Sequence, residues 1–360
     1  MKAAAAYPGR PPLDRDRDGA RKPADVLIFS GVMPGAKVAD LVPGTGYYTR
    51  ILSHLVTGSG HVYPFVPMVG GPQQERAAQR KATEQGKDPP PLPIDAILAI
   101  QNIWEYSGNV TAIWETLSGY GGQFALPEQL DAVFSADGYH YLHGKDFPKL
   151  DMVATNKAIF RAMVPGAVYT IVDNTAAKGA GFTAAETLQR SDPDAVKAEV
   201  LAAGFVLDGE SNVLANPSDD HMKAVSDPSL GDKADQFALR FKKPVNAPIV
   251  DKRPPASTMA NYYGNTYIYL LGIENERHHF YYPNGTYQEF GNTGTMLQEG
   301  YWFWDVDGHN CQLHQYPAAE RGITICHAFT ARELNVKGTQ DNGGGPQPTE
   351  IIPGYHALPH

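Results

Sequence analysis

One short stretch, residues 37–50, limits the folds open to this chain more than any other feature. An apolar run ends in an acid, Asp40, and a turn containing Gly44 and Gly46 leads into a predicted helix from about Tyr47. Glycine can adopt positive φ and lets backbone amides approach a ligand closely, and the first turn of a helix attracts negative charge. The pattern predicts the first strand and helix of an α/β fold that binds a nucleotide-type ligand.

Predicted strands and helices alternate from here to about residue 243. The predicted strands are residues 38–41, 61–66, 110–117, 131–135, 168–172, 205–207 and 236–241. The predicted helices are residues 24–30, 48–56, 73–85, 94–106, 151–163 and 193–203. Strands that alternate with helices form a mostly parallel sheet, because each helix carries the chain back across a face of the sheet. We therefore expect an α/β domain, a Rossmann-like sheet covered by helices on both faces.

Changes in composition divide the chain into four segments. Residues 1–24 combine proline pairs with alternating acidic and basic residues, which predicts an N-terminal arm over the surface. Residues 245–259 are rich in proline and lack periodicity, as is typical of a linker. The predicted α/β domain thus covers residues 25–244, and residues 260–360 form a second domain.

The second domain has the pattern of an antiparallel β-structure. Short aromatic and β-branched runs predict strands at 267–271, 278–282, 286–290, 300–305, 310–316 and 323–329. Asn284-Gly285 and Asp307-Gly308 lie between pairs of these runs, where such dipeptides favour two-residue hairpin turns. We expect a small antiparallel barrel or sandwich.

The two cysteines, Cys311 and Cys326, fall nearly opposite each other if the flanking runs form a hairpin. A disulfide there would close a loop of about 15 residues and stabilise the fold by about 3 kcal/mol on the chain-entropy model. Two neighbouring reduced cysteines in the core are the alternative. A disulfide suits an oxidising compartment, so the pair favours a periplasmic or secreted protein without its signal peptide. A cytoplasmic location stays open.

Charge and hydropathy exclude several classes of partner. The net charge of −9 and the lack of any basic run argue against binding to nucleic acid or to an anionic membrane surface. No apolar stretch approaches the roughly 18 residues that a membrane-spanning helix requires. The expected partner is a small molecule, and the oligomeric state, including a homo-oligomer, stays open.

Residues that follow two of the predicted strands could carry acid–base chemistry. His140 follows the strand at 131–135, with Tyr139 and His143 beside it, and Asp173 ends the strand at 168–172. Ligands of open α/β sheets bind at the carboxyl ends of the strands, so His140 could act as a general base that Asp173 orients. The alternatives are a packed aromatic loop whose histidine caps a backbone group, and an aspartate that caps its own turn.

Two other groups have the chemistry of metal ligands. Asp219-Asp220-His221 cannot all face one ion from a loop, so helix capping or salt bridges are favoured. His279, His314 and His327 could assemble a site in the β-domain, although histidines on the strand surface are the simpler interpretation. No metal site is predicted.

Several short sequence segments together form a recognisable set of motifs. They are residues 38–47, 131–140, 160–169, 192–205, 216–221 and 235–244. The set resembles the motifs of class I S-adenosylmethionine-dependent methyltransferases, in particular a bacterial branch of predicted methyltransferases whose precursors often carry export signals. The resemblance covers about residues 10–244. The C-terminal domain is loosely similar to lipocalin-like barrels, which implies a pocket for a small apolar or aromatic molecule.

The resemblance implies methyl transfer from S-adenosylmethionine to a small aromatic or apolar acceptor, with His140 as the base. Asp40, Gly44 and Gly46 would line the methionine end of the cofactor, with Tyr47 at the start of the helix. A second interpretation keeps the fold and discards the cofactor. In that case the pocket would catalyse a histidine-assisted elimination or isomerisation, or would only bind a ligand.

The chain departs from the family pattern at several positions. Val42 stands where a first glycine is usual, and the second predicted strand has no acid to hold the ribose hydroxyls of the cofactor. The bacterial branch tends to have an acid where Tyr141 stands, and histidines where Asn174 and Gln189 stand.

Overall fold

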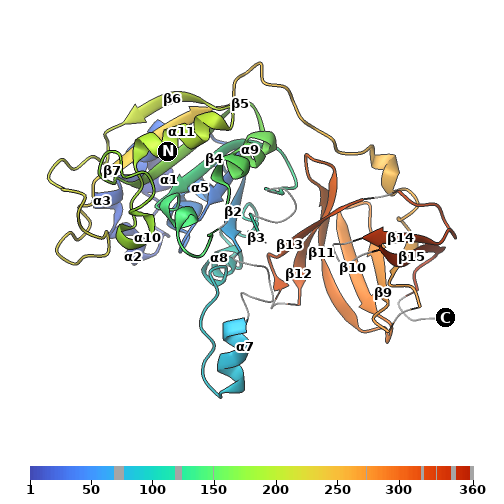
Figure 1. Cartoon of the computed structure of the whole chain (residues 1–360). Coiled ribbons are helices and arrows are strands. Elements are labelled where there is room, and N and C mark those ends of the chain that lie inside the picture. Colours follow the sequence, from blue (N-terminus) through green and yellow to red (C-terminus); the bar gives the residue numbers. More distant parts are fainter. Residues whose placement is uncertain are drawn as a thin grey trace. The chain divides into compact units, whose positions relative to one another are not determined.

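The computed structural model describes residues 1–68, 77–117, 124–148, 150–272, 274–317, 320–329, 331–341 and 346–356. The chain divides into two compact units, one of residues 1–124 and 128–249 and one of residues 125–127 and 250–360 (Figure 1). Of the helix predicted at 73–85, the part that lies inside the described residues is α7 (Ala77–Glu84). No helix within these ranges is long and apolar enough to cross a membrane.

The first unit is built on a seven-stranded sheet in the order β3-β2-β1-β4-β5-β7-β6. The strands are β1 (Lys37–Leu41), β2 (His61–Pro67), β3 (Ile113–Glu115), β4 (Leu130–Ala136), β5 (Met163–Asn174), β6 (Val206–Ser211) and β7 (Gln236–Lys242). Strands β1 to β5 pair in parallel, and β7 runs antiparallel to both of its neighbours. The predicted α/β class and Rossmann-like sheet are confirmed.

The helices cover both faces of this sheet. Besides α7, the longer ones are α4 (Pro23–Ser30), α5 (Tyr47–Leu55), α8 (Asp95–Gln101), α9 (Met152–Ala162) and α11 (Pro193–Ala202). The crossover through α5 moves outward from β1 to β2, whereas the crossover through α9 moves the other way, from β4 to β5. Because both crossovers are right-handed, they place α5 and α9 on opposite faces, as Figure 1 shows.

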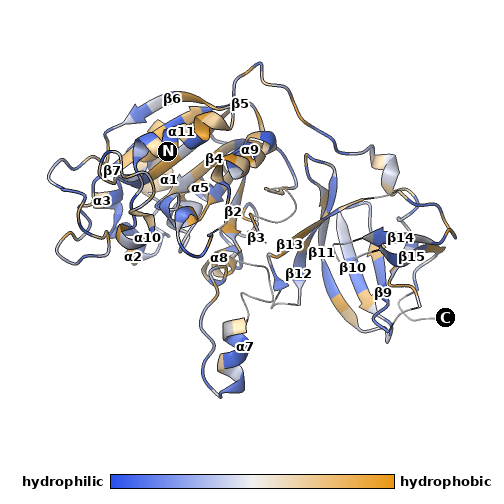
Figure 2. Ribbon diagram, viewed as in Figure 1, coloured by the Kyte–Doolittle hydropathy of each residue, from blue (hydrophilic) through white to orange (hydrophobic). Residues whose placement is uncertain are grey.

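The centre of the sheet explains the apolar runs in the sequence. Val38 and Leu41 of β1 and Val133 of β4 are fully buried, because helices cover both faces of these strands. Figure 2 shows the same apolar character along β2 and β4, in contrast to the hydrophilic α7. The chain leaves β1 toward β2 and β3, and then returns to β4 on the other side of β1. Such a reversal leaves a crevice at the carboxyl ends of β1 and β4, which is where open α/β sheets bind ligands.

The N-terminal segment differs from its prediction as a surface arm. It forms three short helices, α1 (Lys2–Ala5), α2 (Pro12–Arg15) and α3 (Asp18–Arg21). Arg10 makes two hydrogen bonds to Asp18, at 3.0 and 2.8 Å, and its side chain is 0% exposed. Asp14 accepts from Arg50 of α5 at 2.7 and 3.0 Å. The alternating charges indicated a solvated segment, but they find partners within the first unit.

The second unit is an eight-stranded antiparallel sheet in the order β13-β12-β11-β10-β9-β8-β15-β14. The six predicted strands are present as β8 (Asn265–Tyr269), β9 (Arg277–Tyr281), β10 (Thr286–Gly291), β11 (Met296–Trp304), β12 (His309–Tyr316) and β13 (Thr324–Ala328). Gln340 of β14 donates to the carbonyl of Ala328 in β13 at 2.8 Å, so the two edge strands approach each other. The sheet is therefore curled, in agreement with the expected antiparallel β-domain.

Two strands of this sheet, β14 (Gly338–Asp341) and β15 (Pro346–Pro353), were not predicted. The sequence of β15 contains three prolines, Pro346, Pro348 and Pro353, and proline cannot donate to a sheet ladder. Pro346 and Pro348 lie in the part of β15 that pairs only with β14, whereas the pairing with β8 begins at Thr349. These two prolines therefore interrupt no ladder on the β8 side, and Pro353 lies at the last register position of that pairing, opposite Asn265.

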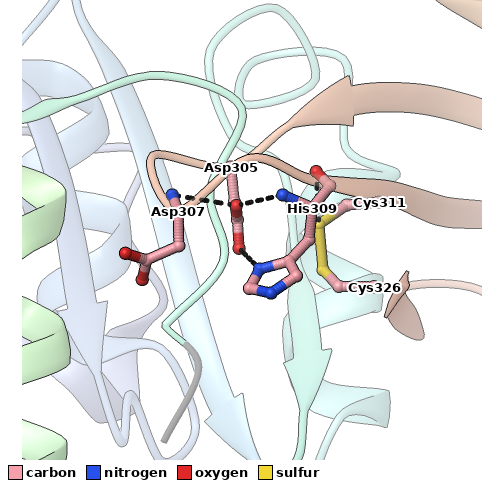
Figure 3. Close-up of a disulfide and its surroundings, with 5 residues drawn as sticks. All are labelled: Asp305, Asp307, His309, Cys311 and Cys326. Carbon is pink, nitrogen blue, oxygen red and sulfur yellow. Dashed lines mark hydrogen bonds and ion pairs between the residues drawn. A yellow bond between two sulfur atoms is a disulfide. The ribbon is translucent and has the colours of Figure 1, made fainter. Parts of the chain in front are cut away.

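The predicted disulfide is present between Cys311 and Cys326, which are paired directly across β12 and β13 (Figure 3). The predicted hairpin turn before β12 is also present. The carboxylate of Asp305 accepts from the backbone amides of Asp307 and His309 at 3.0 and 2.8 Å, and it also binds Nδ1 of His309 at 2.8 Å. This turn and the disulfide together fix the start of β12.

Removing the disulfide should destabilise the second unit. The bond closes a loop with a sequence separation of 15, so the Cys311→Ala/Cys326→Ala variant should lose about 3 kcal/mol of unfolding free energy on the chain-entropy model. Urea denaturation of both proteins measures this loss. Alkylation followed by intact-mass measurement should label both cysteines only after reduction, and labelling of the unreduced folded protein would contradict the assignment.

Candidate functional site

Two pockets open at the carboxyl edge of the first sheet. One, which we call the glycine-turn pocket, has a volume of about 690 Å³ and is lined by the turn after β1, the end of β2 and the start of α8. The other, which we call the polar pocket, has a volume of about 620 Å³ and is lined by α3, by Asn174 at the end of β5 and by Gln236 at the start of β7. Four residues line both pockets: Arg17, Arg21, Asp137 and His140. The two pockets therefore share one wall.

The glycine turn keeps a left-handed backbone even where it lacks glycine. Gly44 and Gly46 have φ of 56° and 80°, and Val42, in place of the usual first glycine, has φ of 57°. A β-branched residue is strained in this region. The side chain of Val42 fits because Gly138, after β4, has none: a Cβ there would lie 2.7 Å from Cβ of Val42. A glycine on a neighbouring loop thus compensates for the valine.

This contact predicts that residues 42 and 138 are energetically coupled. Gly138→Ala should destabilise the protein by about 1–3 kcal/mol, as overpacking does. Adding Val42→Gly should recover most of that loss, because it removes the atoms that the new methyl group would meet. Gly108→Ala is the matched control, since a Cβ at Gly108 would meet nothing within 4 Å. Strictly additive unfolding free energies at residues 42 and 138 would refute the coupling.

Of the predicted cofactor-binding residues, Gly44 and Tyr47 line the glycine-turn pocket, whereas Asp40 and Gly46 lie behind its wall. Asp40 is buried and accepts from the hydroxyl of Thr49 at 2.6 Å, and burial raises its pKa to about 7. Asp40 therefore ties β1 to α5 beneath the turn. A Cβ at Gly46 would lie 2.1 Å from a side-chain carbon of Ile100, so only glycine allows α8 to approach here.

The N-terminal helices complete the wall of the glycine-turn pocket. The hydroxyl of Tyr47 donates to Asp18 at 2.5 Å, and the guanidinium groups of Arg10 and Arg21 lie 5.0 and 4.7 Å from the centre of its ring. Arg21 also donates to Asp137 at 2.7 Å. The sequence prediction missed Arg21 because it lies in the segment expected to be a surface arm.

The structure brings His140 and Asp173 together, as predicted. Asp173 is fully buried and accepts from Nδ1 and from the backbone amide of His140, both at 2.7 Å. It also accepts from the hydroxyl of Ser191 at 3.1 Å and from the amide of Asn174 at 2.9 Å. Because Nδ1 is held by the carboxylate, Nε2 is the nitrogen of His140 that remains for a ligand at the shared wall.

The charges around His140 favour its protonated form. Burial alone would lower the pKa of His140, but the charge and hydrogen bond of Asp173, together with the charge of Asp137, outweigh burial and raise it. This is the arrangement expected of a histidine that accepts a proton during a reaction.

The pKa of His140 should therefore depend on Asp173. In the wild type it should lie above the ordinary 6.5. The pair of His140 and Asp173 then stabilises the fold fully below pH 6.5, the ordinary pKa of histidine. This contribution is lost as the pH rises through the raised pKa of His140. In Asp173→Asn the pKa should fall, as read from the NMR titration of the imidazole C–H shifts. His61, whose pKa burial lowers, is the internal control. An unchanged pKa of His140 in the variant would contradict this account.

Tyr139 and His143, the other predicted catalytic residues, lie away from both pockets. The hydroxyl of Tyr139 donates to Glu199 of α11 at 2.8 Å, and Nε2 of His143 lies 3.1 Å from the same carboxylate. The ring of His143 stacks on Phe182 with centroids 3.4 Å apart. Both side chains therefore pack against α11 rather than into the shared wall.

An acid that the sequence analysis did not identify faces the glycine-turn pocket. β2 has no carboxylate, but Asp95, the first residue of α8, lines this pocket. One of its oxygens accepts from the amide of Leu92 at 2.7 Å. Asp95 follows a proline-rich loop and matches no motif, so only the fold shows that it lies across from the glycine turn.

The positions that depart from the family pattern also lie in the walls of the pockets. Tyr141 lines the glycine-turn pocket, and Asn174 and Gln189 line the polar pocket. Nδ2 of Asn174 donates to the carbonyl of Gln189 at 3.2 Å. The amide of Gln236 bridges Asn174 and Asp137, at 3.0 and 2.5 Å. The polar pocket is thus lined by a network of amides.

In the candidate group at residues 219–221, Asp219 and His221 have structural partners. Asp219 forms a salt bridge with Arg190 at 2.9 Å, and His221 lies 3.0 Å from a carboxylate oxygen of Asp235, which agrees with the favoured salt-bridge role. Within the described ranges, the one group of three close ligand atoms is Asp305 with Cys311 and Cys326. Its sulfurs are joined in the disulfide, so they are not free to bind a metal.

The chain matches no family model and no curated protein. Its solved structural relatives include a methyltransferase dependent on S-adenosylmethionine from Aquifex aeolicus, with 19% identity, 64% of this chain and 95% of that chain covered, and a TM-score of 0.38. A TehB-like methyltransferase of the same cofactor class from Corynebacterium glutamicum has 15% identity, coverages of 64% and 95%, and a TM-score of 0.37.

A third similar structure is the glycopeptide N-methyltransferase MtfA in complex with sinefungin, with 14% identity, coverages of 63% and 87%, and a TM-score of 0.36. Similarities at this level assign no activity to the present chain. The fold of the first unit is defined by its own sheet, with the strand order and the reversed β7 described above.

Proposed function

We propose that the first unit is a methyltransferase that binds S-adenosylmethionine in the glycine-turn pocket and a small hydroxylated acceptor in the polar pocket. The observation that carries the proposal is the position of His140. It lines both pockets, and a fully buried carboxylate holds its Nδ1, so that Nε2 is left at the wall between them. A base at this place serves a reaction whose two partners arrive from different sides.

The residues of the glycine-turn pocket fit the proposed cofactor. Its volume of about 690 Å³ lies within the roughly 300–1,000 Å³ that is usual for small-molecule sites. Gly44 and the first turn of α5 offer backbone amides to the methionine end. Asp95 supplies the carboxylate for the ribose hydroxyls that β2 lacks. When bound, the cofactor supplies an electrophilic methyl group.

His140 and its neighbours would handle the proton of the acceptor. The acceptor oxygen gains the methyl group and loses its proton to Nε2 of His140. Nδ1 stays bonded to Asp173 throughout, and the charges of Asp173 and Asp137 stabilise the imidazolium that forms. The proton then leaves to solvent through the open polar pocket.

The lining of the polar pocket supports a polar acceptor. Lys22 and Lys233 add positive charge to the amide network of Asn174, Gln189 and Gln236. The sequence resemblance led to the expectation of an aromatic or apolar acceptor. Charged and amide side chains bind hydroxyl, carboxylate or phosphate groups better than an apolar surface does.

Two observations favour the second interpretation, a cofactor-independent lyase or isomerase, or a ligand-binding protein. The side chain of Val42 lies in the wall where the family usually has glycine. The disulfide supports a periplasmic or secreted location, and S-adenosylmethionine is made in the cytoplasm. The two proposals share the dyad of His140 and Asp173 and differ in the cofactor.

Binding of the cofactor should separate these proposals. S-adenosylmethionine or its demethylated product should raise the melting temperature, since a dissociation constant of about 1–100 μM stabilises a protein by a few kcal/mol at millimolar ligand. Calorimetry then measures the constant directly. No shift and no heat at millimolar ligand would remove the methyltransferase proposal and leave the cofactor-independent one.

His140→Asn should abolish turnover while leaving binding of the demethylated cofactor nearly unchanged, because His140 acts on the acceptor proton. The expected loss of rate is about 10²–10⁴-fold, as is usual for a general base. His61→Asn is the matched control. His61 is the first residue of β2 and lines neither pocket, so this variant should retain the wild-type rate. Equal rates in the two variants would assign His140 a structural role.

A further inference from the structure

The inner face of the curled sheet in the second unit is polar as well as aromatic. Tyr267, His279 and Glu289 are register partners across β8, β9 and β10, and Asn310 pairs with His327 across β12 and β13. Paired residues point to the same side of a sheet. A narrow pocket of about 60 Å³ opens on this side, lined by Tyr267, His279, Asn310 and His327 among others. We call it the tyrosine pocket.

Polar atoms in the wall of this pocket have no hydrogen-bond partner among the described residues. These atoms are both ring nitrogens of His279 and Nδ2 of Asn310, and all three are buried. His279 is 8% exposed and Asn310 is 5% exposed. The closest carboxylate oxygen to His279, on Glu289, lies 3.6 Å from Nε2, beyond hydrogen-bond distance. Unpaired buried polar groups are costly, so these atoms favour a ligand that pairs them.

The chemistry of these atoms defines what such a ligand must offer. Burial lowers the pKa of His279 to about 3 and that of His327 to about 4, so both rings are neutral at neutral pH. A neutral imidazole has one donor and one acceptor, and Nδ2 of Asn310 is a donor. The matching ligand therefore carries a donor and acceptors on one edge. It is also uncharged, because the pocket offers no full charge to pair with.

Aromatic rings form the other walls. The rings of Tyr262 and Tyr281 meet edge to face, 5.8 Å apart, and the ring of Tyr262 lies 5.2 Å from that of Phe329. The planes of His279 and Tyr281 are parallel within 8°. The hydroxyl of Tyr281 already accepts from Gln312 at 2.8 Å. The rings thus present flat apolar surfaces around the unpaired atoms, and such surfaces suit a planar group.

We propose that the tyrosine pocket binds the edge of a neutral planar amide, such as an aromatic carboxamide or the lactam of a pyrimidine base. Nδ2 of Asn310 donates to the carbonyl of the ligand, and one ring nitrogen of His279 accepts from the N–H of its amide. The pocket is small, so it holds the amide edge while the tyrosine rings contact the faces. This site is separate from the methyl-transfer proposal and does not depend on it.

Ligand-observed NMR on the full chain tests the site with three probes of similar size. Benzamide has both the amide edge and the flat ring, toluene lacks the edge, and cyclohexanecarboxamide lacks the flat ring. Benzamide should bind about tenfold more tightly than toluene, which lacks the amide edge, and about tenfold more tightly than cyclohexanecarboxamide, which lacks the flat ring. Binding of toluene equal to that of benzamide, or no binding of benzamide at millimolar concentration, would overturn the proposal.

Two variants test whether benzamide binds on the inner face of the sheet. His279→Phe keeps a flat ring of similar size and removes both nitrogens, and Asn310→Leu removes the donor. Each should weaken benzamide at least about tenfold, and thermal denaturation checks that each remains folded. Tyr301→Phe is the matched control, because Tyr301 is 50% exposed on the same sheet and does not line this pocket. Wild-type affinity in the two inner-face variants would overturn the assignment.

Discussion

A single buried carboxylate organises the edge of the first sheet. Asp173, the second-last residue of β5, has no exposed surface, and it accepts hydrogen bonds from the segment after β4, from the amide that follows it and from Ser191. A buried charge is tolerated only when hydrogen bonds and opposite charge compensate for the loss of water. The positions of η1 (His140–His143), the end of β5 and the segment at Ser191 therefore depend on one another, and His140 is oriented as a result.

Much of the first unit could be predicted from the sequence because its signals are local. Apolar runs, helix periodicity and a glycine turn each describe a few consecutive residues, and right-handed crossovers then allow few arrangements. The dyad of His140 and Asp173 was predictable for the same reason, since both residues follow strands that end at the same edge of the sheet. The disulfide followed from the pairing of two strands across one turn.

The remaining parts depend on contacts between distant segments. The N-terminal charges looked solvated because Arg50 and Tyr47, their partners, lie far along the chain. Asp95 reaches the glycine-turn pocket only because α8 packs against Gly46. The side chains of Tyr139 and His143 turn toward α11, a direction that their neighbours in sequence do not specify. β15 was not predicted from the sequence, and two of its three prolines lie in the part that pairs only with β14.

The contact between Val42 and Gly138 constrains the order in which substitutions can accumulate in related chains. A valine at residue 42 is accommodated only where residue 138 already lacks a side chain, so the glycine must come first. A lineage that later replaced Gly138 would have to return residue 42 to a smaller residue beforehand. The two positions therefore form an epistatic pair.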